Sequence, residues 1–122
     1  MGVITVTNIV GVPLMFRAWF TKDKIMKFYK STEFFDFVYT NYKEISKYKI
    51  IISQYTGVNS KDGQQIYVGD IVYWDDFKDS PEIVIWTETE KSFVCDYPDG
   101  SPGSWLDDQC LIKGNIFENP IL

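Results

Sequence analysis

The sequence of 122 residues contains no histidine and only two cysteines, Cys95 and Cys110. Without histidine, neither a Ser-His-Asp nor a Cys-His catalytic system can form, unless a lysine serves as the base. A zinc site of two cysteines and two histidines is excluded for the same reason. The sequence has no C-x-x-C motif, and neither cysteine has a basic neighbour that would lower its thiol pKa. We therefore expect two buried thiols rather than a disulfide in a reducing cytoplasm.

Long apolar runs are missing as well. No stretch approaches the ~20 apolar residues that a membrane-spanning helix needs. The apolar residues 1–16 lack the basic segment that opens a secretory signal. Glycine-rich phosphate-binding patterns are also absent, so we expect a cytoplasmic protein with no cofactor. Leucine occurs only four times, whereas aromatic residues make up 17% of the chain, a composition that favours β-strands over a helical bundle.

The charged residues are distributed unevenly along the chain. Residues 1–50 carry eight basic and four acidic side chains, 8 − 4 = +4, and residues 51–122 carry four and thirteen, 4 − 13 = −9. An acidic C-terminal half attracts basic partners and lacks the cations that neutralise phosphates. We therefore expect no DNA or RNA binding by this half. A charge distribution selected only for solubility is the alternative.

Alternation of large apolar and other residues from Phe16 to Phe20, and again from Ile25 to Tyr29, predicts a β-hairpin. Residues 31–49 are ambiguous. Apolar residues recur there every three to five positions, which favours a helix of two to three turns, but weak helix formers leave a strand pair open. Further strands are expected over residues 49–56, 70–74, 83–86, 92–97 and 110–117, with a loop over 98–103.

Glycines mark the expected bends between these strands. The run from Asn59 to Gly63 is a turn, and it lacks the D-x-D-x-D-G spacing of a calcium loop. A glycine directly before Asp70 allows a tight bend, across which the carboxylate can accept backbone N–H groups. The predicted structural turn residues are Gly57, Gly63, Gly69, Asp70 and Gly114.

The chain contains a series of short sequence motifs. They are F-R-A-W at 16–19, Q-Y-T-G at 54–57, D-G at 62–63, I-Y at 66–67, G-D-I-V at 69–72 and G-N-I-F-E-N-P at 114–120. In this the chain resembles the YopX family, small proteins encoded mainly by phages and prophages, for which no biochemical activity is established. It departs from the family at Phe20, where an acidic residue is common, and at Val68, where glutamate is common.

The resemblance implies a mainly β fold: a small antiparallel bent sheet or a partly open SH3-like barrel with at most one or two short helices. It covers residues 15–122 as a single domain and leaves residues 1–14 outside as an N-terminal extension. That extension is β-rich at 3–6 and 9–12, and three interpretations stay open: an extra edge strand, an unstructured leader, or residues before a natural start at Met15.

Carboxylates and aromatic rings are the remaining chemical groups. We expect a non-catalytic phage or prophage protein that binds a host or phage protein, as a regulator or an inhibitor of host defence, through an acidic, aromatic surface. A metal-dependent carboxylate enzyme acting on nucleic acid is the alternative. We predict no catalytic, cofactor-binding or metal-binding residue. A basic protein is the expected partner, and the predicted partner-binding residues are Asp75, Asp76, Asp79, Glu82, Asp99, Trp105, Asp107 and Asp108.

Overall fold

The computed structural model describes residues 15–119, so the expectations for residues 1–14 lie outside the described residues. The chain divides after Tyr55 into two compact units. The boundary falls inside strand β3 (Ile50–Asn59) rather than in a linker. Residues 51–55 carry no charge, so the net charges of +4 and −9 belong to the first and the second unit. A single domain over residues 15–122 stays a prediction.

The first unit is built on a β-hairpin. Strands β1 (Met15–Phe20) and β2 (Ile25–Lys30) pair antiparallel, and β1 also pairs with β3 on its other side. The hairpin that the alternating sequence predicts is therefore confirmed. Because side chains alternate across a strand, every second residue of β1 points to the same face, and Phe16 and Ala18 on that face are buried.

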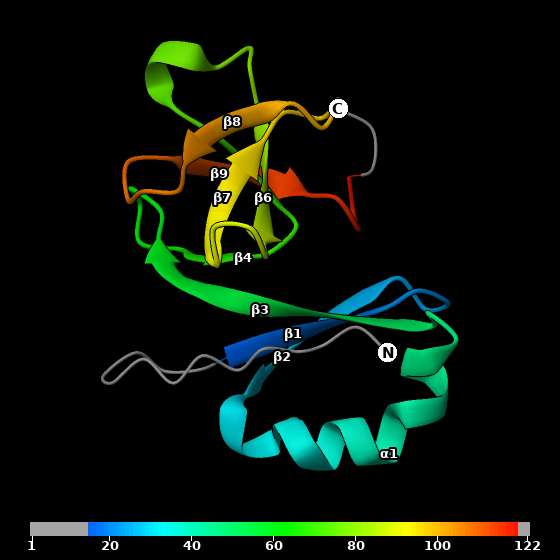
Figure 1. Ribbon diagram of the computed structural model, residues 1–122. Coiled ribbons are helices and arrows are strands. Elements are labelled where there is room, and N and C mark those ends of the chain that lie inside the picture. Colours follow the sequence, from blue (N-terminus) through cyan, green and yellow to red (C-terminus); the bar gives the residue numbers. More distant parts are fainter. Residues whose placement is uncertain (1–14, 120–122) are drawn as a thin grey trace. The chain divides into compact units, whose positions relative to one another are not determined.

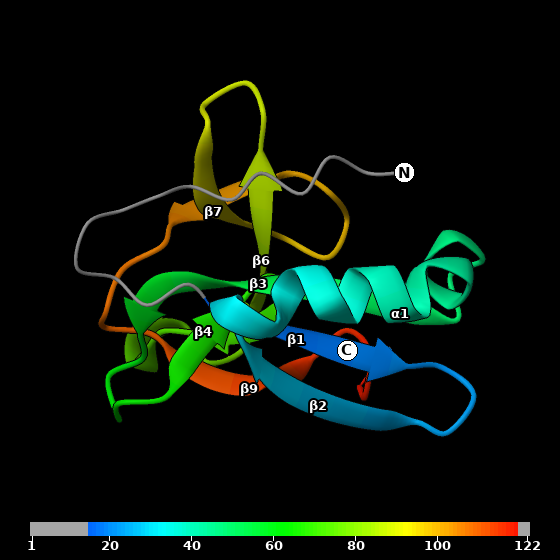
Figure 2. The same ribbon diagram turned by 90° about the horizontal axis from the view of Figure 1, so that it is seen from below.

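A helix packs alongside β1 and β2 in this unit (Figures 1 and 2). It consists of a 3-10 turn, η1 (Ser31–Glu33), and α1 (Phe34–Ser46), which confirms the helix favoured for residues 31–49. The ring of Phe37 lies 5.5 Å from that of Phe16 and 4.6 Å from that of Tyr29, measured between centroids. Tertiary packing of aromatic rings thus stabilises a helix whose residues are weak helix formers.

The second unit contains a five-stranded antiparallel sheet in the order β8-β7-β6-β5-β9. It is open, with β8 and β9 at its edges, and β4 pairs instead with β3. The mainly β fold is confirmed. The elements are β4 (Gln65–Tyr67), β5 (Asp70–Tyr73), the 3-10 turn η2 (Asp75–Phe77), β6 (Glu82–Thr87), β7 (Ser92–Asp96), β8 (Pro102–Trp105) and β9 (Leu111–Asn115).

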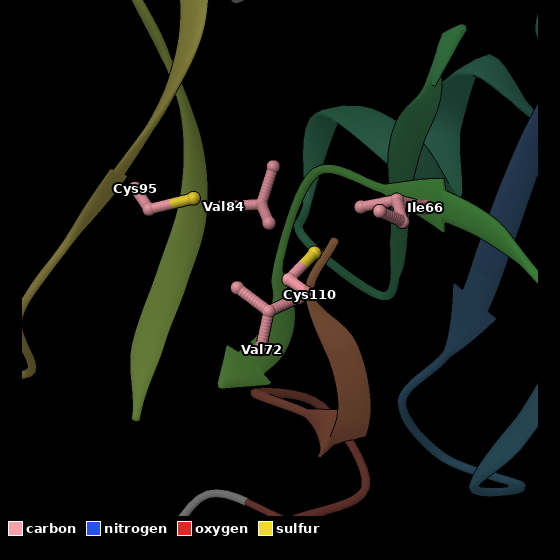
Figure 3. Close-up of a cluster of buried hydrophobic side chains, with 5 residues drawn as sticks. All are labelled: Ile66, Val72, Val84, Cys95 and Cys110. Carbon is pink, nitrogen blue, oxygen red and sulfur yellow. The ribbon is translucent and has the colours of Figure 1, made fainter. Parts of the chain in front are cut away.

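A cluster of aliphatic side chains and two cysteines lies in the core of the second unit (Figure 3), with Trp74 packed against it. Both cysteines lie in it as free thiols, which confirms the prediction of two buried thiols. Burial raises the pKa of the Cys110 thiol to about 11 and raises that of Cys95 further. The buried residues of this cluster are Ile66, Val72, Val84, Cys95 and Cys110.

One boundary expectation is wrong. Residues 98–103 were expected to form a loop, but Pro102 and Gly103 begin strand β8. Proline and glycine weaken interior strands, yet an edge strand needs ladder bonds on one side only, and proline is tolerated at its first residue. Among the described residues, no helix is long and apolar enough to cross a membrane.

Candidate functional site

Three loops meet at one place in the second unit. The indole N–H of Trp74, directly after β5, donates to Oδ1 of Asp107 at 3.0 Å. In the turn after β3, the ammonium of Lys61 lies 2.9 Å from Oδ2 of Asp75, and its backbone N–H donates to the carbonyl of Cys110 at 2.8 Å. These bonds bring together the loops around residues 61, 75 and 107, although they are far apart in the sequence.

These loops carry several exposed carboxylates, which together we call the acidic surface. Two of its residues follow β5 in η2, one lies further along the same loop, and two precede β9. Phe77 ends η2, directly after two of these carboxylates, and is 67% exposed. The sequence analysis did not single out this ring, although the run D-D-F-K-D signals an aromatic side chain within an acidic loop. The acidic surface comprises Asp75, Asp76, Phe77, Asp79, Asp107 and Asp108.

Hydrogen bonds fix the carboxylates that precede β9. Besides the Trp74 indole, Oδ1 of Asp107 accepts the backbone N–H of Gln109 at 2.9 Å. The side-chain amide of Gln109 donates to Oδ1 of Asp108, also at 2.9 Å. A groove of about 620 Å³ lies beside them, lined by residues 57–61 and 107–109. The anionic groups are therefore held in place before any partner arrives, which lowers the ordering cost of binding.

Asp75 differs from its neighbours because it is paired. Its hydrogen bond and charge interaction with Lys61 hold the pKa of the Asp75 carboxyl below its usual range, and the same bond raises the pKa of Lys61. Both side chains are about half exposed, so solvent screens the pair and it contributes little to stability. Asp75 thus adds no net charge to the acidic surface. Asp76 and Asp79 are exposed carboxylates, and the exposed Lys78 between them offsets one of their charges.

Glu82 was predicted to bind a partner, and the structure shows that this is wrong. Only 4% of the residue is exposed, because it begins β6 and points beneath the edge strand β8. Its Oε1 accepts the backbone N–H of Ser104 at 2.5 Å, and its Oε2 accepts the Ser104 hydroxyl at 3.2 Å. The carboxylate therefore anchors β8 inside the unit and is not available to a partner.

The other two predicted binding residues lie on the segment between β7 and β9. Asp99 accepts the backbone N–H of Ser101 at 2.9 Å and its hydroxyl at 2.6 Å, and these bonds lower the pKa of the Asp99 carboxyl. Its hydrogen bonds are local to the turn before β8 and do not join it to the acidic surface. Trp105, at the end of β8, is 67% exposed and is available for contact.

The side chains at this site limit the reactions that it could catalyse. Among residues 15–119, no three cysteine or carboxylate side chains lie close enough together to hold a metal ion. Burial keeps the Cys95 and Cys110 thiols protonated, so they are poor nucleophiles. What the arrangement offers is a set of fixed anions next to exposed rings.

Of the predicted turn residues, Gly63 and Gly69 lie in turns and Asp70 begins β5, whereas Gly57 and Gly114 lie inside strands β3 and β9. Gly57 and Gly63 have φ of +85° and +87°. The Thr56 hydroxyl beside Gly57 accepts the backbone N–H of Val58 at 3.1 Å and donates to the carbonyl of Ile66 at 2.8 Å. A left-handed backbone is readily adopted only by glycine. The D-G motif therefore corresponds to a turn, whereas the Q-Y-T-G motif lies inside strand β3, where Gly57 is a local left-handed irregularity.

Two further sequence motifs are associated with turns. Gly69 has φ +94°, and the carboxylate of Asp70, which is 2% exposed, accepts the backbone N–H of Tyr67 at 2.7 Å. At the end of β9, the side chain of Asn119 occupies the space where a β-carbon on Gly114 would lie. The G-D motif therefore lies at the turn before β5, and the G-N-I-F-E-N motif spans the end of β9 and the turn that follows it.

These observations define a class: a small, mainly β protein with an open sheet, whose sequence motifs lie in its strands and in the turns that connect them. The chain belongs to the YopX protein family, whose sequence model matches residues 15–122. The structure is also similar to the crystal structure of protein EF1440 from Enterococcus faecalis, with a TM-score of 0.55 and 21% identity, over 88% of this chain and 95% of that chain. At this identity the likeness shows the fold alone. No curated protein matches the chain.

Proposed function

We propose that this YopX-family protein is a non-catalytic binding protein, of phage or prophage origin, that docks a basic protein on the acidic surface. The observation that carries the proposal is the Trp74–Asp107 hydrogen bond, because it joins two acidic loops into one surface. In a bacterial cytoplasm such a surface would serve a regulator or an inhibitor of host defence. Phage origin and the cytoplasmic setting belong to this proposal.

Carboxylates and rings have different roles in such a surface. Exposed Asp76, Asp79 and Asp108 steer a cationic partner over distances of the Debye length, ~8 Å at physiological salt. The exposed rings of Phe77 and Trp105 offer contact area to the bound partner. The −9 charge of the second unit adds a long-range attraction for basic proteins and repels nucleic acid.

The test starts from the full chain, immobilised and used to capture proteins from a bacterial lysate at low salt. The association rate of the captured protein is then measured by surface plasmon resonance over a range of salt concentrations. Asp76→Lys and Asp108→Lys are expected to slow association more than they speed dissociation, and added salt is expected to do the same. Glu90→Lys is the matched control, since Glu90 is an exposed acidic residue in the β6–β7 turn, outside the acidic surface.

The competing activity is cleavage of nucleic acid by a metal-dependent carboxylate enzyme. The purified chain is incubated with single- and double-stranded DNA and RNA in Mg²⁺ or Mn²⁺, together with the Asp76→Asn and Asp107→Asn variants. Cleavage that depends on these carboxylates would replace the binding proposal. A captured partner whose association is insensitive to Asp76→Lys and Asp108→Lys would also count against it.

A further inference from the structure

Three aromatic side chains on α1 project into solvent along one side of the helix. Phe35 is 80% exposed, Tyr39 is 88% exposed and Tyr42 is 60% exposed. Spacings of four and three residues place them on the same helix face. Phe37, which packs on β1 and β2, belongs to another face. The helix is kinked at Asn41, yet Tyr42 remains largely exposed. We call Phe35, Tyr39 and Tyr42 the aromatic stripe.

Exposed rings in a contiguous row are typical of interaction surfaces, because small soluble domains seldom leave such area in water without a partner. The charge around the stripe indicates the kind of partner. Residues 33–49 contain three lysines and three acidic residues, so their balance is 3 − 3 = 0. A nucleic-acid site needs more cationic than anionic side chains to neutralise phosphates, and residues 33–49 carry no such excess. A neutral partner surface with its own aromatic rings fits better.

We propose that the aromatic stripe binds the same stripe of a second copy of the chain, with the two α1 helices antiparallel about a two-fold axis. The positions of Asp36 and Lys43 support this choice. They are seven residues apart, so they lie two helical turns apart on the same side of the helix, next to the stripe. Both are exposed, and Tyr39 lies midway between them.

A two-fold axis near Tyr39 places the N-terminal half of one helix against the C-terminal half of the other. Asp36 then faces Lys43 of the second copy, and Lys43 faces Asp36 of the second copy. Phe35 meets Tyr42 in the same reciprocal way, and the two Tyr39 rings meet at the axis. A parallel two-fold arrangement would instead place the two copies of Asp36 and Lys43 on opposite flanks of the interface, so these pairs would not form. The charge pattern on the helix is thus complementary to itself only in the antiparallel orientation.

The available area is sufficient for a specific contact. An aromatic side chain buries about 150–250 Å² on full burial, so the six rings of two stripes supply on the order of 1,000 Å². That value is near the lower end for specific interfaces, and the dimer is therefore expected to dissociate on dilution. The proposal concerns the first unit and goes beyond the proposed function, so its test is independent of any partner of the acidic surface.

Sedimentation velocity of the full chain, from micromolar to submillimolar concentration, is expected to show a reversible monomer–dimer equilibrium. Tyr39→Glu places two carboxylates at the axis and is expected to raise the dissociation constant at least about thirtyfold, the level of an interface hot spot. Tyr48→Glu is the matched control, because Tyr48 is 79% exposed and follows the helix outside the stripe. Circular dichroism and thermal unfolding of each variant check that it is folded.

A charge swap tests the orientation. Asp36→Lys and Lys43→Asp each place like charges opposite one another twice, and each is expected to weaken the dimer about tenfold. The double variant Asp36→Lys/Lys43→Asp restores both reciprocal pairs and is expected to dimerise like the natural chain.

Three results would overturn the proposal. The first is a chain that stays monomeric at every concentration, which leaves the stripe to a different protein. The second is a dimer that Tyr39→Glu does not weaken, which places the contact elsewhere. The third is a double variant as weak as its two single variants, which excludes the antiparallel pairing.

Discussion

The Glu82 carboxylate holds the edge strand β8 by accepting both the backbone N–H and the hydroxyl of Ser104. Glu82 is buried, so both bonds lie in a site that is largely shielded from water. The strand that it anchors opens with proline and glycine, two residues with little preference for strands. A side chain 22 positions earlier in the sequence therefore helps to define this strand.

Gly103 is expected to be intolerant of substitution. A β-carbon there would overlap Oε1 of Glu82 and lie 2.6 Å from the carbonyl oxygen of Cys95, which is backbone and cannot move cheaply. Gly103→Ala is therefore expected to lower the free energy of unfolding by about 1–3 kcal/mol, as for other overpacked sites. Denaturant unfolding measures this change. At Gly100, with φ +88° and open space, alanine is expected to cost less, and equal costs would contradict this account.

Replacing Glu82 tests the anchor itself. Glu82→Ala leaves the backbone N–H of Ser104 without its acceptor, which is expected to cost about 1–3 kcal/mol of stability. Amide hydrogen exchange should show faster exchange at Ser104 and Trp105, while β5 and β9 change less. Glu90→Ala, in the exposed β6–β7 turn, is the control. Unchanged protection of β8 in Glu82→Ala would refute the role of this carboxylate.

Gly69 is expected to tolerate no β-branched residue. Its φ of +94° is left-handed, and an added β-carbon would stand 2.9 Å from Cε2 of Phe117. Gly69→Val is expected to lower the free energy of unfolding by more than about 1 kcal/mol. Gly63 also has a left-handed backbone, with φ +87°, so Gly63→Val incurs the same backbone strain, but an added β-carbon at Gly63 would meet open space. The difference between the two variants in thermal or denaturant unfolding isolates the Phe117 contact.

Asp70 is expected to contribute to stability through the same turn. Asp70→Ala removes the acceptor of the Tyr67 backbone N–H in a buried site, at an expected cost of about 1–3 kcal/mol. Asp70→Asn keeps one oxygen acceptor and should cost less. Equal stability of the natural chain and Asp70→Ala, measured by thermal unfolding, would show that the carboxylate is not needed for the turn.

Both thiols are expected to react only when the chain unfolds. At pH 8 a thiol reagent should modify Cys95 and Cys110 slowly in the native protein and rapidly in denaturant. Burial raises the pKa of both thiols in the folded protein. Their contribution to stability is therefore fully present at pH values below the pKa of a thiol in the unfolded chain, ~8.5. That contribution is lost as the pH rises through the folded value of about 11 for Cys110. Cys110→Ala should flatten this alkaline loss of stability, and rapid labelling of the native chain would contradict it.

Much of the fold could be predicted because it depends on local patterns. The hairpin of β1 and β2 follows from period-two alternation, and the β6–β7 hairpin from two short β-rich runs around a polar turn. The site was harder to predict. Asp76 and Asp108 could be chosen as exposed acids, but only the Trp74–Asp107 bond shows that their loops meet. Phe77 was missed, although it stands within the acidic run D-D-F-K-D, which indicates an exposed loop.

The sequence by itself determined the mainly β architecture, the turns at Gly63 and Gly69, and the reduced, buried state of the two cysteines. These depend on backbone preference, periodicity and composition, which act over a few residues. Only the tertiary structure decided that Glu82 is buried under β8 and that the loops around residues 61, 75 and 107 meet. The physical reason is that contacts between residues far apart in the chain are set by how strands pair and pack, and such pairing leaves no local sequence pattern.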